Sequence, residues 1–152
     1  MHLTTYLTLL SAAERTLADS YVVVSGGHAD EADVHYTCAD LARQATSHVE
    51  ALAPAVDRYA DRAEPEPDRL HPPGLDATRT GPVGLLRDLQ DLYQLASLVD
   101  ITWAVVGQAA AGARDRDLID TVAACHPQTT AQLAWLRSRM RAAAPQTLLV
   151  AP

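Results

Sequence analysis

The sequence predicts an all-α protein: an antiparallel four-helix bundle with a long crossover between its second and third helices. Apolar side chains recur at alternating steps of three and four residues in four segments, which is the spacing of one helix face. Residues 64–84, rich in Pro and Gly, separate the second segment from the third. No stretch of useful length alternates apolar and polar residues as a half-buried strand does.

The first two helices are expected over residues 3–25 and about 30–62. In the first, Glu14 occupies a position on the apolar face where a leucine would be expected, and a pair of glycines ends the helix. In the second, His48 continues the apolar face, and Pro54 is expected to kink the helix because it removes a backbone donor. Each helix therefore carries one ionisable group on its inner face.

The stretch 64–84 is much longer than the usual connection of about 2 to 8 residues between bundle helices. At about 3.3 Å per residue it is long enough to cross a whole bundle. The short links on either side of the stretch make antiparallel neighbours, so this crossover lets the second and third helices run parallel.

The last two helices are expected over residues 85–110 and 115–143. Asp100 falls within the wide apolar face of the third helix, and His126 continues the apolar face of the fourth. Pro127 is expected to kink or split the fourth helix. The tail, residues 144–152, either covers an apolar patch or frays.

Length and composition indicate one soluble domain, residues 1–152, in the cytoplasm. A formal charge of −7 argues against nucleic acid as a partner, because phosphates need a basic face. We also expect no membrane association, since no run reaches the roughly 18 apolar residues of a membrane span. Cys38 and Cys125 are expected at different depths in the bundle, which predicts two free thiols.

The four ionisable groups are predicted to meet in one mid-bundle layer. At a rise of about 1.5 Å per residue, His48 and Asp100 share a depth if the second and third helices start level. By the same rise, His126 and Glu14 fall within about one turn of that depth.

This arrangement resembles the ferritin-like superfamily, including small bacterial stress-associated bundles. The family places a Glu on the first and third helices and Glu-x-x-His on the second and fourth, and these side chains hold a pair of metal ions. Glu14, His48 and His126 match that pattern, and Asp100 is a shorter stand-in for the third-helix Glu. The two bridging glutamates are replaced by Ala45 and Ala123, so the resemblance implies a degenerate bundle without a dinuclear iron centre.

Two interpretations of the layer remain open. Glu14, His48, Asp100 and His126 would together suit a single zinc or ferrous ion. Alternatively, Glu14 pairs with His48 and Asp100 with His126, as two buried carboxylate–imidazole pairs that satisfy each other. A second group, His28 with its helical neighbours Glu31 and His35, is interpreted as an exposed first turn rather than a surface metal site.

Three functions follow as hypotheses. The first is a binding or structural bundle without redox activity, which self-associates as a dimer. The second is a protein that binds one iron or zinc ion, or an oxidoreductase that depends on that ion. The third is a small-molecule carrier, whose pocket would lie where Ala45 and Ala123 replace the bulkier glutamates.

Overall fold

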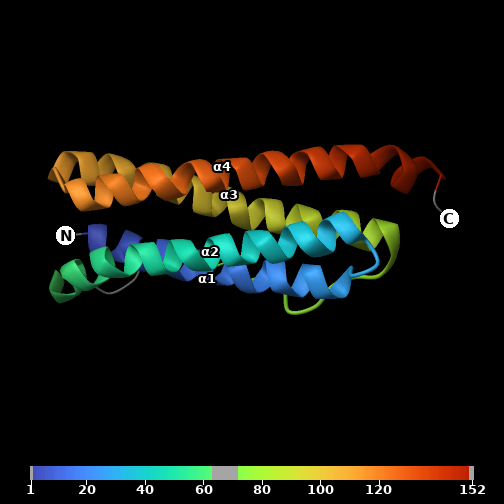
Figure 1. The fold of residues 1–152 in the computed structure, drawn as a ribbon, viewed down its shortest axis with the longest axis horizontal. Helices are drawn as coiled ribbons and strands as arrows, with labels where there is room; N and C mark the ends of the chain where they lie inside the picture. Colours follow the sequence, from blue (N-terminus) through green and yellow to red (C-terminus); the bar gives the residue numbers. More distant parts are fainter. Residues whose placement is uncertain (1, 63–71, 151–152) are drawn as a thin grey trace.

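The computed structural model describes residues 2–62 and 72–150, which fold into four long helices and contain no strand (Figure 1). This confirms the all-α class for the described part of the chain. Two single turns extend the second and fourth helices, a 3₁₀ turn (η1) and a π turn (η2). The bounds are α1 Leu3–Gly27, α2 Ala32–Tyr59, η1 Ala60–Arg62, α3 Gly81–Ala113, α4 Arg116–Pro145 and η2 Gln146–Val150.

Hydrogen bonds at the two ends of the bundle show which way the helices run. The Thr4 hydroxyl donates to the Tyr59 carbonyl at 3.0 Å, so α1 begins where α2 ends. The Tyr59 hydroxyl donates to Asp115 at 2.9 Å, which brings the beginning of α4 to the same end. At the opposite end, Arg139 of α4 donates to Asp33 of α2 at 2.6 Å. The chain therefore starts α2 and α3 at the same end of the bundle (Figure 1).

The core is built mostly from large aliphatic side chains of α1, α2 and α3. The contribution of α4 differs from the predicted apolar face at His126, which is only partly buried because its neighbour Cys125 faces the core. The face that α4 turns inward includes two polar side chains. Its buried residues are Leu118, Cys125, Thr129, Gln132 and Leu136.

The crossover ends earlier than predicted. Residues 72–80 are irregular, whereas Gly81–Gly84, expected to belong to the crossover, already form the first turn of α3. Pro82 is tolerated there because the first amides of a helix have no intrahelical acceptor. Gly81 has a φ of 75°, a left-handed conformation that favours glycine. The part of the predicted crossover before residue 72, from residue 64 to residue 71, lies outside the described residues.

The corner between α1 and α2 corrects the interpretation of His28. Its side chain is buried instead of exposed, and its Nε2 lies 2.7 Å from Asp88 Oδ2 on α3. Glu31 points elsewhere and pairs with Arg139 at 3.3 Å. The imidazole is buried because the crossover and α3 pack over the corner, and helical spacing along α2 alone does not reveal that contact.

Two further features concern the cysteines and the apolar surface. Cys38 and Cys125 are both free and buried, as predicted.

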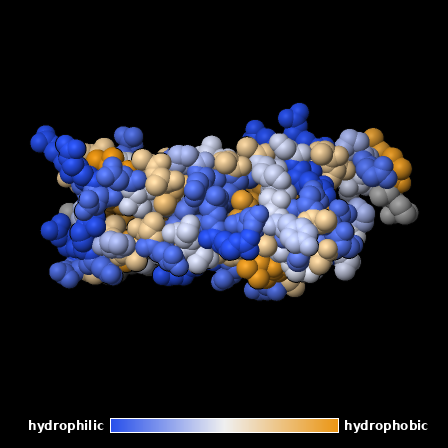
Figure 2. Space-filling model, viewed as in Figure 1, coloured by the Kyte–Doolittle hydropathy of each residue, from blue (hydrophilic) through white to orange (hydrophobic). Residues whose placement is uncertain are grey.

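By length and composition alone, α3 is apolar enough to cross a membrane, with a mean hydropathy of 1.3 and 39% of its most apolar window buried inside the bundle. The tail residues Leu148–Val150 are exposed and form an apolar tip at one end of the bundle (Figure 2).

Candidate functional site

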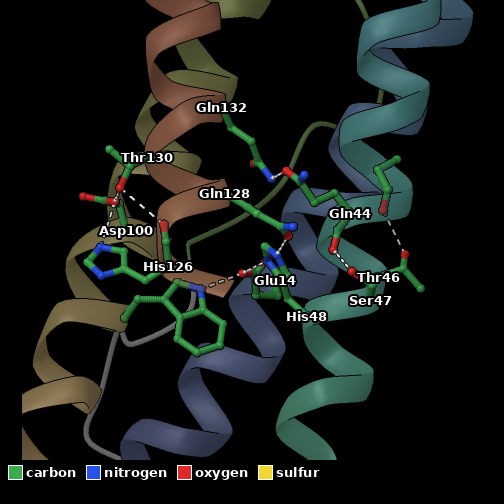
Figure 3. A network of polar contacts seen from close by, with 12 residues as sticks. Glu14, Gln44, Thr46, Ser47, His48, Asp100, His126, Gln128, Thr130 and Gln132 are labelled. Carbon is green, nitrogen blue, oxygen red and sulfur yellow. Dashed lines mark hydrogen bonds and ion pairs between the residues drawn. The ribbon is translucent and has the colours of Figure 1, made fainter. Parts of the chain in front are cut away.

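A buried carboxylate–imidazole pair lies between α1 and α2 in the middle of the bundle (Figure 3). Glu14 is 0% exposed and His48 is 1% exposed. The Nδ1 atom of His48 lies 2.8 Å from Glu14 Oε1. The indole N–H of Trp103 on α3 donates to the same carboxylate oxygen at 2.8 Å. Glu14, His48 and Trp103 lie on the inner faces of their helices. Their polar atoms therefore bond to one another across the core and not to water.

The second ring nitrogen of His48 is also engaged. Its Nε2 lies 2.7 Å from the side-chain oxygen of Gln128 on α4. Both ring nitrogens thus face side-chain oxygens, an arrangement that suits the imidazolium form, which donates from both nitrogens. Burial lowers the pKa of His48, but the hydrogen bond and charge of Glu14 and the hydrogen bond to Gln128 together raise it above its usual value. The geometry and the raised pKa of His48 both favour its charged form beside Glu14.

The pair is one of two polar layers that cross the bundle. Glu14, His48, Trp103 and Gln128 connect all four helices in the first layer. One turn away, the Tyr21 hydroxyl donates to Gln132 at 2.9 Å, and the Gln132 amide donates to Gln44 at 2.7 Å (Figure 3). These bonds span α1, α2 and α4.

Tyr21 belongs to the second layer and is also buried. Burial, together with the nearby Cys38 and Glu14, raises the pKa of Tyr21 well above its usual value. Its hydroxyl thus stays neutral and acts as a hydrogen-bond donor.

Asp100 and His126 form a separate pair between α3 and α4. His126 Nε2 lies 3.0 Å from Asp100 Oδ1, and the side chains are 28% and 29% exposed. The Thr130 hydroxyl donates to the same Asp100 oxygen at 2.9 Å. The structure thus arranges the four candidate side chains as two pairs. Within the described residues, no group of three or more His, Cys, Asp or Glu side chains is placed to hold a metal ion.

The rotation of α4 explains this separation. Cys125 of α4 faces the core, so its neighbour His126 points toward the edge with α3. Ala123, which the resemblance placed at a bridging-ligand position, is exposed, whereas Ala45 on α2 is fully buried. The two alanines therefore do not face each other across one central space.

The donor set at the centre does not fit a dinuclear metal centre. A metal ligand must offer a lone pair, and both nitrogens of His48 are instead bonded to oxygen. Glu14 is the carboxylate of this layer. One carboxylate cannot replace the two bridging glutamates whose positions are held by Ala45 and Ala123. The other carboxylate oxygen, Glu14 Oε2, is buried and accepts no hydrogen bond from a described residue.

The two thiols are poorly suited to nucleophilic chemistry. Burial, followed by the charge of Asp33, raises the pKa of Cys38 to about 12. Burial, followed by the charge of Glu14, raises the pKa of Cys125 to about 11. Thiolate is the reactive form, so both side chains behave at neutral pH as small apolar groups.

Sequence reasoning missed four members of the polar layers: Trp103, Gln44, Gln128 and Gln132. Trp103 fits the apolar face of α3, yet its N–H is a buried donor, and a buried tryptophan needs a partner. That requirement was a usable signal. Gln128 and Gln132 carried no signal, because an amide side chain on a helix is normally solvated, and only the packing of α4 against α2 shows their role.

Chemically, the arrangement can hold a charge pair in the core and tie the helices together. Three comparisons with known proteins add no identification. No family model, curated protein or solved structure matches this chain. The functional conclusion consequently depends on the geometry of these residues alone.

Proposed function

We propose that this chain is a degenerate ferritin-like bundle in which the Glu14–His48 ion pair stands where a metal layer would be. Its role is binding or structural, without redox chemistry. The observation that carries the proposal is the engagement of both nitrogens of the buried His48 by the side-chain oxygens of Glu14 and Gln128. The helix directions and the long crossover support the ferritin-like assignment.

A buried ion pair suits a structural role because it specifies one arrangement of the helices. Desolvating two charges costs several kcal/mol, which the attraction between them offsets only when the geometry is good. Here the hydrogen bonds of Trp103 and Gln128 complete that geometry from the two remaining helices. A shifted register of α1 or α2 would leave a buried charge unpaired, which is strongly unfavourable. A shifted register of α3 or α4 would remove the hydrogen bond of Trp103 or Gln128.

The proposal includes self-association as a cytoplasmic homodimer without nucleic acid. The outer face of α3 supports it, because Ile101 is 58% exposed and Val105 is 45% exposed. From Ile101 to Ala113 the helix has no charged residue, so two chains of charge −7 can approach there without direct repulsion. Sedimentation equilibrium of the wild-type chain and of Val105→Asp tests this: a dimer that dissociates in the variant agrees with it, and a wild-type monomer contradicts it.

A second candidate function, binding of one iron or zinc ion, is favoured by Glu14 Oε2. This buried oxygen lacks a described hydrogen-bond partner, and such an atom is a natural ligand or water acceptor. His48 would have to lose a proton and release Gln128 to join it. Asp100 and His126 would also have to leave their own pair, which requires α4 to rotate.

A mid-bundle small-molecule carrier is the third candidate. Ala123 lines an open groove of about 400 Å³ between α3 and α4, together with Gly107 and Val122. Ala45 is fully buried in the packed interior. A ligand in the groove would therefore touch the Ala123 side alone, which weakens this candidate.

Elemental analysis separates the first two functions. The chain is purified without chelator, incubated with ferrous or zinc ion, desalted and analysed, alongside His48→Ala and His126→Ala. The proposal expects substoichiometric metal in all three. Stoichiometric metal that both variants lose would overturn it and establish the four-residue site. Metal lost from His48→Ala and retained by His126→Ala would overturn it in favour of a site formed by Glu14 and His48 without the Asp100–His126 pair.

A further inference from the structure

The largest pocket described lies away from the buried pair, between the crossover and the outer face of α3. Its volume is about 810 Å³, within the usual range of about 300 to 1,000 Å³ for small-molecule sites. Leu75 of the crossover and Leu95 and Leu98 of α3 supply apolar wall, with Pro72 and Pro73 beside them. This wall can accept an apolar body.

The crossover wall of this pocket is held in place at two points. At one, the Leu75 amide donates to the Ser20 hydroxyl of α1 at 3.1 Å. The adjacent Gly74 passes so close to α1 that a Cβ there would lie 2.7 Å from Ser20 Oγ and 2.9 Å from Thr16 Cγ2. At the other, Arg79 donates to Asp88 of α3 at 2.6 Å. The pocket is thus framed by fixed backbone.

The charges around the pocket leave one carboxylate over. Arg79 bonds both Asp88 and Asp91, at 2.6 and 2.9 Å, and Arg87 bonds Asp91 at 3.1 Å. Asp88, which does not line the pocket, is also bonded by His28 at 2.7 Å. Asp76, which lines the pocket, is exposed and has no ion-pair partner among the described residues. Among the described lining residues, Asp76 and Asp91 outnumber Arg79, so these residues present a net negative charge beside apolar walls.

We infer that this pocket binds a small amphipathic cation, an apolar body that carries an ammonium group. The apolar body packs against Leu75, Leu95 and Leu98, and the ammonium group faces Asp76. Gln94, whose amide has no side-chain partner in the described part of the chain, adds a hydrogen-bonding group at the wall. The site shares no residue with the Glu14–His48 layer, so its test is independent of the metal analysis.

Fluorescence titration with a matched pair of probes tests the inference on the full chain. Dansylcadaverine carries an apolar ring system and a primary amine, and dansylamide carries the same ring system without the charge. We expect saturable binding of dansylcadaverine. Dansylamide should bind with an affinity about two- to fivefold lower, which corresponds to the free energy that a partly exposed ion pair contributes. Equal affinity for both probes would overturn the assignment of a cation.

Two variants and two controls place the probe in the pocket. Leu98→Trp fills the apolar wall and should lower dansylcadaverine affinity at least about tenfold, a loss of roughly 1.4 kcal/mol. Asp76→Asn should remove the preference for dansylcadaverine over dansylamide. Leu149→Trp and Asp120→Asn make the same changes on exposed positions outside the pocket and should leave affinity unchanged. No saturable binding, or equal effects of Leu98→Trp and Leu149→Trp, would overturn the site.

Discussion

Replacing Glu14 with Gln removes the counter-charge of His48 and keeps nearly the same shape. The amide oxygen can still accept from Trp103, so packing and one hydrogen bond are preserved. Breaking a buried ion pair by removing one partner costs about 3 to 5 kcal/mol. With a denaturant slope of about 2 kcal/mol per M, this lowers the urea midpoint by roughly 1.5 to 2.5 M. A loss of this size is a large part of the roughly 5 to 15 kcal/mol that keeps a domain folded.

The pH dependence of stability gives the direction in which the effect of Glu14→Gln should change with pH. The pKa of His48 is raised in the folded protein above its ordinary value of 6.5. The stability from the charged pair is therefore fully present below that unfolded-state value and is lost as pH rises through the folded pKa. In Glu14→Gln, burial without a counter-charge lowers the pKa of His48, so stability falls instead as the solution becomes more acidic. The destabilisation by Glu14→Gln should be larger at about pH 6 than at about pH 8.

Urea unfolding followed by far-ultraviolet circular dichroism measures both effects. Subtracting the profile of His48→Gln from that of the wild type cancels the other histidines. The double variant completes a cycle, whose coupling energy reports the pair itself. The range should stop near pH 8.5, where unfolded thiols ionise while burial keeps the pKa of Cys38 at about 12. Single variants within about 0.5 kcal/mol of the wild type, or a flat difference profile, would refute the charged pair.

Three further predictions concern stability and reactivity. Cys38 and Cys125 should not react with a disulfide reagent such as DTNB in the folded protein, and both should react in urea; fast reaction of either without urea contradicts their burial. Asp115→Ala should lower unfolding free energy by about 1 to 2 kcal/mol at neutral pH, because the side chain caps α4. Burial raises the pKa of Asp115, but hydrogen bonds lower it overall, so this loss should shrink below the ordinary value of 3.8; an undiminished loss in acid contradicts it. Gly74→Ala should lower the melting temperature, because a Cβ there would lie 2.7 Å from Ser20 Oγ and 2.9 Å from Thr16 Cγ2; an unchanged melting temperature contradicts this close approach.

The helices could be predicted from the sequence because their signal is local. The recurrence of apolar residues at steps of three and four located all four long helices to within a few residues. The largest error was at Gly81–Gly84, where composition indicated a loop and the structure begins α3. Glycine and proline are tolerated in the first turn of a helix. Composition alone therefore places the start of such a helix too far along the chain.

The inner face of α4 could not be predicted in the same way. Apolar spacing favoured His126, which is only partly buried, whereas the structure buries Cys125 and Gln132. A polar side chain is buried when a partner from another helix satisfies it, and Gln132 finds Tyr21 and Gln44. That partner is invisible to a pattern that counts apolar residues along one helix.

The sequence by itself determined the helical class, the approximate helix bounds, the two free cysteines and the choice of Glu14 and His48 as inward-facing groups. These properties follow from periodicity and spacing within each segment. Only the tertiary structure decided that Asp100 and His126 form their own pair at the edge, and that Trp103 and Gln128 complete the central one. The physical reason is rotation. Successive residues of a helix point about 100° apart, so a rotation of α4 about its axis by less than one residue changes which side chain faces the core without changing its helical pattern.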